Sequence, residues 1–373
     1  PDPPRSEQKP NRFFLFASPP TVGSEIDPRD VALAMITYNS AERLGHIFDD
    51  VLISSLHIPY KIFILVDDSP GDATREKVRR FADEHGKELI VERSRLYGGA
   101  DRPTRATARQ TAIEIFRFST SARYIFFLDD DFVLSPAWWP EFQLKKRWFE
   151  KLYIKWGLAW GINWDSTPDR FLWLKALGID YTQYLIEAFY RRGGMHDTLI
   201  PRDVLEEAQD VYGPIPPELH VYEDAWIWHS IHCLGYLPII IHNSGVHMNP
   251  WRFDLKREME RWRLAIAVAH KYGINEDGIQ YINRPVWWQA LALARPIIGV
   301  PLALYVNIKA YGLREGVRRA FVRQYAKLRW RIMNLTATAK YGRVPETPCE
   351  GLARAAAEWW EKEGKKKPVK VRV

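Results

Sequence analysis

Residues 126–135 read FFLDDDFVLS, an apolar run that leads directly into Asp129, Asp130 and Asp131. The apolar part is typical of a buried strand, and three carboxylates at its end are costly without a positive partner. Alternate residues of an extended segment point the same way, so we expect Asp129 and Asp131 to share a site. Mg²⁺ or Mn²⁺, which commonly bridges carboxylates and phosphates, is the expected partner. A capping or solvated cluster at a loop start is the alternative.

Apolar runs and amphipathic stretches alternate around this segment. We expect strands at 31–38, 61–68, 87–94 and 122–131, and helices at 41–55, 73–86 and 105–119. This alternation predicts a mostly parallel, doubly wound α/β sheet. Ligands of such sheets bind beyond the carboxyl ends of the strands, where the chain reads TYN, VDDSPGD and LDDDF. Further along, we expect strands at 157–164 and within 236–248, and a helix over 253–273.

Charge is unevenly distributed along the 373 residues, whose net charge is +7. Residues 314–373 hold 16 Lys and Arg against 6 Glu, a net +10, which leaves residues 1–313 at −3. A basic tail of this kind indicates an anionic membrane surface or nucleic acid, and a solvated helix face is the bland alternative. The 16 Trp suggest carbohydrate platforms or a membrane interface, or else core packing alone.

Residues 286–308 read VWWQALALARPIIGVPLALYVNI and carry one charge, Arg295. Their length and polarity fit a membrane span, but Pro296 and Pro301 interrupt the run, and a single span would place the basic tail outside. We favour a kinked, in-plane or re-entrant membrane element; a span and a buried core helix are the alternatives. The next segment, 314–333, has Val317, Phe321, Tyr325, Leu328 and Ile332 on one helical face among arginines, as an interfacial helix on anionic lipid would.

The chain has two cysteines, Cys233 and Cys349, and their number and spacing match neither a disulfide framework nor a zinc site. We therefore expect a reducing compartment. Residues 1–28 are Pro-rich near the start and are expected to form an extended arm without a signal peptide. The predicted organisation is this arm, a catalytic domain over 29–250 and a helical C-terminal region over 251–373.

Five short motifs occur in a fixed order: TYNSA (37–41), VDDSPGD (66–72), GGADRPTRATARQTAI (98–113), FFLDDDF (126–132) and VYEDAWIWHSIHCLGY (221–236). Across residues 30–262 the chain resembles the large inverting GT-A glycosyltransferase family that includes dolichyl-phosphate sugar synthases and cellulose synthases. The resemblance implies a Rossmann-like GT-A domain that binds a nucleotide diphosphate sugar through Mn²⁺ or Mg²⁺.

The resemblance implies roles for the donor-side residues. Asp129 and Asp131 would hold the metal on the diphosphate, and Asp130 is left to the donor sugar or the ribose. Tyr38 and Asn39 would border the nucleotide, Asp67 and Asp68 would hold its base and ribose, and Arg109 would face phosphate. Two alternatives stay open, since VDDSPGD is also plain turn chemistry and Arg109 fits a surface position.

The second half of the resemblance concerns catalysis and the acceptor. Asp224, beside Glu223, would be the base that deprotonates the acceptor hydroxyl, although acids favour helix N-termini in any case. Gly193 and Gly194 would allow close approach to the donor sugar, or form a turn. His247 would be a further metal ligand, or a structural histidine. Arg261 and Trp262 end a Glu-x-x-Arg-Trp stretch, in which Arg261 would contact diphosphate and Trp262 would stack on the acceptor sugar. The family has Gln where this stretch begins with Glu, and this difference argues against processive polymer synthesis.

We therefore expect a metal-dependent inverting glycosyltransferase on the cytoplasmic face of the cell membrane, with Trp287, Trp288 and the 314–333 helix in lipid. The expected donor is GDP-mannose, by family membership only, and the expected acceptor is a lipid-linked or membrane-proximal glycan. Asp129-Asp130-Asp131-Phe132-Val133 also fits a haloacid-type phosphatase with Asp129 as nucleophile. A non-enzymatic membrane- or nucleic-acid-binding protein is the other alternative, but the tail lacks the motifs of RNA readers and we expect no nucleic acid.

Overall fold

An eight-stranded mixed sheet forms the centre of the computed structural model, which describes residues 26–165, 168–219, 221–248, 255–274, 285–341, 345 and 347–362. The sheet order is β3-β2-β1-β4-β7-β6-β8-β5. The strands are β1 (Val31–Thr37), β2 (Ile62–Asp67), β3 (Glu88–Glu92), β4 (Tyr124–Leu128), β5 (Phe132–Leu134), β6 (Trp156–Asp165), β7 (Asp197–Pro201) and β8 (Leu237–His247).

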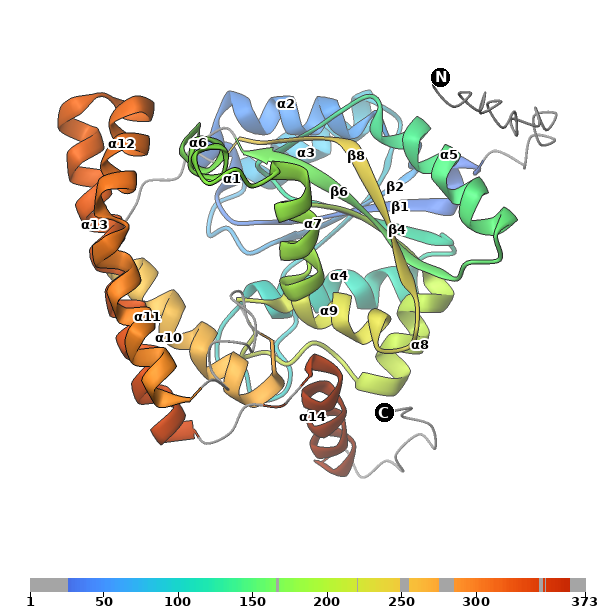
Figure 1. Ribbon diagram of the computed structural model, residues 1–373. Coiled ribbons are helices and arrows are strands. Elements are labelled where there is room, and N and C mark those ends of the chain that lie inside the picture. The colour runs from blue at the N-terminus through green and yellow to red at the C-terminus, as the bar shows by residue number, and fades with distance from the viewer. Residues whose placement is uncertain are drawn as a thin grey trace, which may run out of the picture.

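Helices cover both faces of this sheet and continue into a C-terminal helical part (Figure 1). They are α1 (Ser40–Leu44), α2 (His46–Ser55), α3 (Ala73–Glu84), α4 (Arg105–Ser119), α5 (Trp138–Lys151), α6 (Pro168–Ala176), α7 (Tyr181–Arg192), α8 (Arg202–Tyr212), α9 (Glu223–His232), α10 (Leu255–Tyr272), α11 (Val286–Ile298), α12 (Val300–Tyr311), α13 (Leu313–Tyr341) and α14 (Pro348–Lys362). The predicted α/β class is confirmed.

Strand direction divides the sheet into two halves. Strands β3, β2, β1 and β4 are parallel, as the alternation of strands and helices predicts. Strand β7 then runs antiparallel to β4 and to β6, and β5 runs antiparallel to β8. Strands β6 and β8 are again parallel to each other, so the predicted parallel pairing holds for the first four strands and for this pair, and β7 and β5 are the antiparallel exceptions.

The N-terminal helices follow the predicted pattern with one break. The predicted helix over 41–55 is divided into α1 and α2 at Gly45, whose φ of +57° lies in the left-handed region that favours glycine. Helix α4 spans the predicted 105–119, and its start is fixed by a capping box in which Thr104 and Thr107 exchange hydrogen bonds. Local signals are therefore sufficient to position α4, which carries two site arginines.

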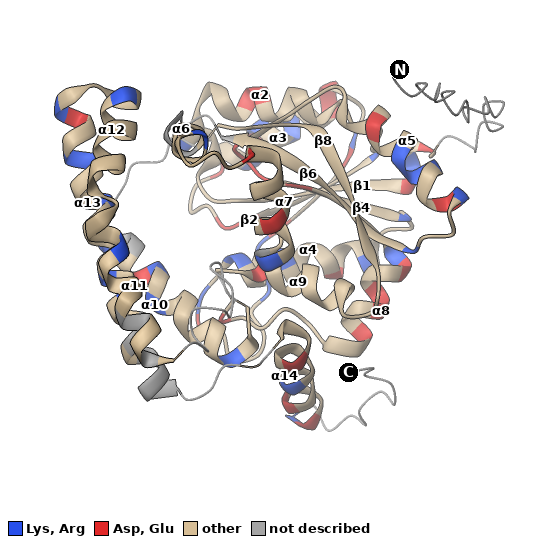
Figure 2. Cartoon of the chain, in the orientation of Figure 1, with Lys and Arg blue, Asp and Glu red and all other residues tan. Residues whose placement is uncertain are grey.

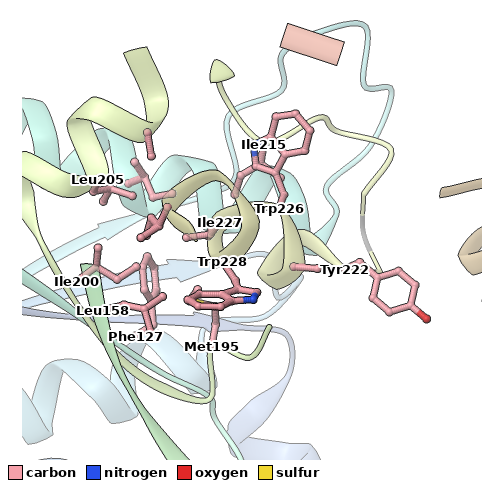
Figure 3. Close-up of a cluster of buried hydrophobic side chains, with 14 of the residues drawn as sticks. Phe127, Leu158, Met195, Ile200, Leu205, Ile215, Tyr222, Trp226, Ile227 and Trp228 are labelled. Atoms are coloured by element: carbon pink, nitrogen blue, oxygen red, sulfur yellow. The ribbon is translucent and has the colours of Figure 1, made fainter. Parts of the chain in front are cut away.

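Two apolar clusters fill the two faces of the sheet. One packs α4, α7, α8 and α9 against it, and the other packs α2, α3 and α5. Figure 3 shows part of the first cluster, where Trp228 of α9 lies near Met195 and close to Phe127 and Leu158 of the sheet. Since Trp138, Trp226 and Trp228 are fully buried, core packing accounts for these three tryptophans of the Trp-rich composition.

Helices α11, α12 and α13 form a column beside the α/β part (Figure 1). The apolar run over 286–308 is two helices that meet at Gly299, which agrees with the predicted kink. Gly312, with φ +78°, ends α12, and α13 then packs back along α12 so closely that a Cβ on Gly316 would lie 2.5 Å from backbone atoms of Ile308. Phe321, Tyr325 and Ile332 are exposed, as expected for the apolar face of 314–333.

A disulfide between Cys233 and Cys349 corrects the expectation that the two cysteines match no disulfide framework. Cys233 lies just after α9 and Cys349 lies in α14, and the bond encloses the helical region between them. The residues are 116 positions apart, so their pairing depends on the return of α14 onto α8 and α9 and is invisible in local spacing. The expected reducing compartment loses its basis, because structural disulfides belong to oxidising environments.

Candidate active site

Asp129, Asp131 and His247 bring their side chains together at the end of β4. One ligand atom from each lies within 4.8 Å of the others, and His247 Nε2 is 2.8 Å from Asp131 Oδ1. All three residues are partly buried, and their donor set of two carboxylates and one imidazole suits a divalent cation of the Mn²⁺ type. The three predicted ligands therefore lie close enough together to hold one metal ion.

The reason for this clustering differs from the expected one. Strand β4 ends at Leu128, so the three aspartates lie in a turn and side-chain alternation along a strand does not orient them. The turn leads into β5, whose Phe132 pairs with His247 of β8. The backbone N–H of Asp129 also donates to the carbonyl oxygen of His196, at 3.0 Å. Turn and strand register together therefore position the cluster.

Asp130 points away from the cluster, as expected, toward α1. Its Oδ2 accepts hydrogen bonds from Ser40 Oγ and from the guanidinium of Arg43. Burial raises the pKa of Asp130, and Arg43 partly offsets this. The pKa of Asp131 is lowered because, although burial acts to raise it, the hydrogen bond from His247 and the charges of Arg43 and Arg105 outweigh burial. The sugar or ribose role of Asp130 stays a prediction.

Arg109 is buried, with 4% of its side chain exposed, and this excludes the alternative of a surface arginine. Its Nη2 lies 3.4 Å from Asp129 Oδ1 and 3.4 Å from Glu223 Oε1. Because it is engaged with two carboxylates, the expectation that it faces phosphate is corrected: Arg109 connects the aspartate turn to the start of α9. A buried cation between two acids offsets their desolvation.

Arg105, one helical turn before Arg109, was missed by the sequence reasoning. It is exposed at the start of α4. Crowding by protein atoms acts to lower the pKa of its guanidinium, but the nearby carboxylates, foremost Glu223 and Asp129 and then Asp224, outweigh this and raise it. The signal that could have found it is the spacing of four residues from Arg109, which places both on one helical face.

Glu223 and Asp224 begin α9 and differ in their surroundings. Glu223 is buried against Arg109, whereas Asp224 is only partly buried and its Oδ1 accepts from the N–H of Ala225 at 2.8 Å. Tyr222, which precedes them, has φ +77° and turns the chain sharply into the helix. Of the two acids, Asp224 is the one more open to a reacting group.

Gly193 and Gly194 end α7 against α9 and β6. Gly193 has φ +70°, and a Cβ there would lie 2.8 Å from the carbonyl oxygen of Asp224. A Cβ on Gly194 would lie 2.6 Å from the indole nitrogen of Trp160. Their small size is explained by packing beside the acid pair, and their predicted role at the donor sugar stays a prediction.

The first two strands end in Tyr38, Asn39, Asp67 and Asp68. Tyr38 is exposed, and the N–H of Asn39 donates to Ser69 Oγ at 2.7 Å. The expectation for Asp67 is corrected: this carboxylate is completely buried, accepts from Thr37 Oγ1 at 2.8 Å and lies 3.3 Å from Arg75, so it stabilises its own turn. Asp68 accepts from the N–H and Oγ of Ser94, which connects the β2 and β3 ends.

Asp197, which follows His196, pairs with the residue just before the aspartate turn and was also missed. It is completely buried in β7 opposite Leu128, accepts from Ser244 Oγ, and accepts from Trp138 Nε1 at 2.8 Å. Burial raises its pKa to about 7. The sequence offers no sign of this, because the acid belongs to a strand that pairs with β4 from far along the chain.

Arg261 and Trp262 lie in α10, whose main partners are α13 and α14. Arg261 is exposed and Trp262 is partly buried. Their predicted contacts with diphosphate and acceptor sugar stay predictions.

Comparison with known proteins gives one family match. Residues 33–146 match the glycosyl transferase family 2 model. These residues include most of β1, all of β2 and α4, and the whole aspartate turn. No curated protein matches the chain.

Solved structures of low identity resemble the chain in fold. One is the mannosyltransferase PcManGT of Pyrobaculum calidifontis in complex with GDP-Man and Mn²⁺, with 16% identity over 91% of this chain and 80% of that one, at a TM-score of 0.46. Another is glucosyl-3-phosphoglycerate synthase of Mycobacterium tuberculosis with Mn²⁺ and uridine-diphosphate, with 15% identity over 65% and 79%, at 0.39. S. aureus TarS has 11% identity over 84% and 91%, at 0.42.

Proposed function

Because the chain is a glycosyltransferase of the GT-A class, we propose that it transfers a sugar from a nucleotide diphosphate sugar to a membrane-proximal acceptor with inversion at the anomeric carbon. The observation that carries this proposal is the junction of two groups of acids. Arg109 connects the metal-ligand turn at Asp129 to the acid pair at Glu223 and Asp224. The residues that would bind the metal and the acid pair that would accept the proton are therefore held together by Arg109. The phosphatase and non-enzymatic alternatives are not kept.

Three residues would hold the cation: Asp129, Asp131 and His247. When bound, Mn²⁺ or Mg²⁺ would neutralise the negative charge of the departing nucleoside diphosphate. Arg105, exposed near the same acids, would add positive charge for the diphosphate in place of the buried Arg109. Asp224 would accept the proton of the acceptor hydroxyl, while Glu223 stays bound to Arg109 and fixes the start of α9.

The proposed donor to test first is GDP-mannose, with Tyr38, Asn39 and Asp68 beside the nucleotide. A thermal-shift panel of nucleotide sugars, with and without Mn²⁺, identifies the donor because a ligand that binds the native state raises its apparent stability. Transfer activity of Asp129→Ala and Asp131→Ala tests the mechanism. We expect loss of at least a hundredfold in each; full activity of both variants with Mn²⁺ or Mg²⁺ would refute the proposed metal role.

The column of α11, α12 and α13 is the proposed membrane-binding part. Leu291–Tyr311 is long and apolar enough to cross a membrane, with a mean hydropathy of 1.6 and 28% of its window buried, but its break at Gly299 favours an in-plane or re-entrant element. Large apolar side chains are exposed along the column: Trp287, Leu291, Ile297, Ile298, Tyr305, Leu313, Phe321, Tyr325 and Ile332. Figure 2 shows that most charged segments of the column are basic, which suits anionic lipid.

Vesicle flotation tests this part of the proposal. We expect the chain to float with vesicles that contain phosphatidylglycerol and less with neutral phosphatidylcholine vesicles. Phe321→Glu with Tyr325→Glu should abolish flotation, while Phe118→Glu, a change at a still more exposed aromatic residue on α4, should not. Equal flotation of all three proteins would contradict the assignment. The cytoplasmic side of the membrane stays a proposal as well, and the disulfide between Cys233 and Cys349 argues against it.

A further inference from the structure

An exposed aromatic stack lies at the end of β6. The indole of Trp164 packs on the ring of Tyr181 with centroids 5.1 Å apart and planes 11° from parallel. Phe171 of α6 meets Tyr181 edge-on at 6.1 Å. Tyr181 is buried, with 7% exposed, but Trp164 remains 48% exposed. A large flat ring is thus held in place from behind while much of its surface faces solvent.

Strand register places Trp164 at the same edge of the sheet as the metal cluster, although its ring projects to the opposite face from Asp165, the residue paired with His247. In the β6–β8 pairing, Asp165 lies opposite His247 and Trp164 lies opposite Val246. Neighbouring strands are about 4.8 Å apart and residues along a strand rise about 3.3 Å. The backbone of Trp164 is therefore one residue from the position that faces a proposed metal ligand.

The stack also lies on the catalytic face of the sheet. Tyr181 belongs to the same apolar cluster as Trp226 and Trp228 of α9, and α9 begins with Glu223 and Asp224. Helix α7, which starts at Tyr181, ends at Gly193 against the backbone of Asp224. One helix therefore connects the aromatic stack to the acid pair.

Strand order separates the stack from the nucleotide. The proposed nucleotide residues follow β1 and β2, whereas Trp164 is on β6, with β4 and β7 between β1 and β6. The metal cluster comes from the ends of β4 and β8, and in the sheet order β6 lies between these two strands. A planar ring at the strand ends that carry the metal cluster, and away from the ends of β1 and β2, is placed to receive the acceptor.

We propose that Trp164, backed by Tyr181, binds a sugar ring of the acceptor, so that the acceptor is a glycoside and not a bare lipid phosphate. This inference rests on the proposed function. An indole offers a wide apolar face with one polar N–H, which matches the apolar face and polar rim of a pyranose. The stack lies next to α6, which packs on α12, and Lys327 of α13 lies 4.4 Å over the Trp173 ring of α6. A glycolipid could therefore have its lipid at the column and its sugar at Trp164.

The test compares Trp164→Ala, Trp164→Phe and Trp148→Ala in the full chain. Trp148, on α5, is a similarly exposed tryptophan of the opposite helical layer and serves as the matched control. Acceptors are a panel of octyl glycosides, with farnesyl phosphate as the sugar-free probe. Metal-dependent hydrolysis of the donor without acceptor reports the donor site separately, and thermal unfolding reports folding.

We expect transfer to at least one octyl glycoside and little to farnesyl phosphate. Trp164→Ala should raise the acceptor KM roughly tenfold or more, as expected for loss of a ring stack, with donor hydrolysis within about twofold of wild type. Trp164→Phe should be intermediate and Trp148→Ala unchanged. The inference is overturned by an unchanged KM in both Trp164 variants, by farnesyl phosphate matching the best glycoside, or by donor hydrolysis without transfer to any glycoside. Absence of metal-dependent donor cleavage would instead overturn the proposed function.

Discussion

His247 Nε2 lies 2.8 Å from Asp131 Oδ1 although the two residues are 116 positions apart. The pairing of Phe132 with His247 between β5 and β8 produces this contact. When Nε2 carries the ring proton it donates to Asp131, and in the other neutral tautomer its lone pair can bind a metal, so the same geometry serves a hydrogen bond without the ion and a shared site with it.

We expect His247→Ala to weaken Mn²⁺ binding at least tenfold and Mg²⁺ binding less, because Mg²⁺ relies on oxygen ligands and retains both aspartates. Calorimetric titration of each metal, in the presence of a nucleoside diphosphate, measures this difference. His242→Ala is the control, since His242 is exposed on the same strand and contacts Glu141 instead. Equal Mn²⁺ affinity in wild type and His247→Ala would remove His247 from the ligand set.

Arg109→Met should destabilise the fold by about 3 kcal/mol, because it leaves the buried Glu223 and the partly buried Asp129 without their cation. Urea unfolding measures the loss. The double variant Arg109→Met, Glu223→Gln should recover part of it, since the uncompensated buried charge is then gone. A loss below about 1 kcal/mol in the single variant, or no recovery in the double one, would show that the pair is not coupled.

Gly193→Ala should lose activity beyond its effect on stability. The backbone of Gly193, at φ +70° and ψ −168°, is in a region that costs other residues about 1–3 kcal/mol, and the new Cβ would press on the Asp224 carbonyl. Gly312→Ala is matched in backbone, at φ +78° and ψ 172°, but has no atom within 4 Å of the new Cβ. Both variants should unfold more easily, and only Gly193→Ala should have a reduced kcat. Equal kcat values would contradict a positioning role for Gly193.

Local patterns in the sequence predict helices and strands better than they predict which side chains contact one another. Helix α4 has both its apolar spacing and its Thr104 cap within the segment itself, and its predicted bounds are confirmed. The orientation of Asp67 depends instead on Thr37, which β1 places beside it 30 residues away in the chain. The engagement of Arg109 with Glu223 depends likewise on a helix that begins 114 residues later. The types of residue at the site can therefore be predicted from the sequence. The directions of their side chains depend on the order of the strands in the sheet.

The acidic residues illustrate the same limit. Asp129 and Asp131 were expected to share a site by strand alternation, and they do share one, but through a turn and the β5–β8 register. The predicted side of Asp130 is consistent with its contacts to Ser40 and Arg43. Asp197 was not predicted, because a single acid inside a strand belongs to no recognisable motif. Only the pairing of β7 with β4 places it opposite Leu128, next to the aspartate turn.

His229 should make stability depend on pH between about 4 and 6.5. It is buried in α9, its Nε2 lies 2.9 Å from the carbonyl oxygen of Arg191, and burial lowers its pKa to about 4. The unfolded chain, whose histidines have a pKa near 6.5, binds a proton in this window that the folded chain does not. The contribution is therefore complete above pH 6.5 and is lost as pH falls toward 4, by about 3 kcal/mol in total.

Comparison with His229→Gln isolates this effect from other titrating groups. Glutamine can donate to the same carbonyl but does not titrate. The difference in free energy of unfolding between wild type and variant should shrink toward low pH, as measured by urea unfolding at pH 7, 5.5 and 4. Parallel pH profiles for the two proteins would show that His229 is not buried as a neutral residue.

Reduction of the disulfide between Cys233 and Cys349 should destabilise the attachment of α14. The bond closes a loop of more than 100 residues, for which the chain-entropy model gives about 4–5 kcal/mol. Cys349→Ser and chemically reduced wild type should therefore unfold at similar, lower denaturant concentrations, and the oxidised chain should contain no reactive thiol under denaturing conditions. Leu352→Ala is the control, because Leu352 is buried in α14 and its loss weakens the packing in oxidised and reduced protein alike. Two titratable thiols in the unreduced chain would contradict the pairing.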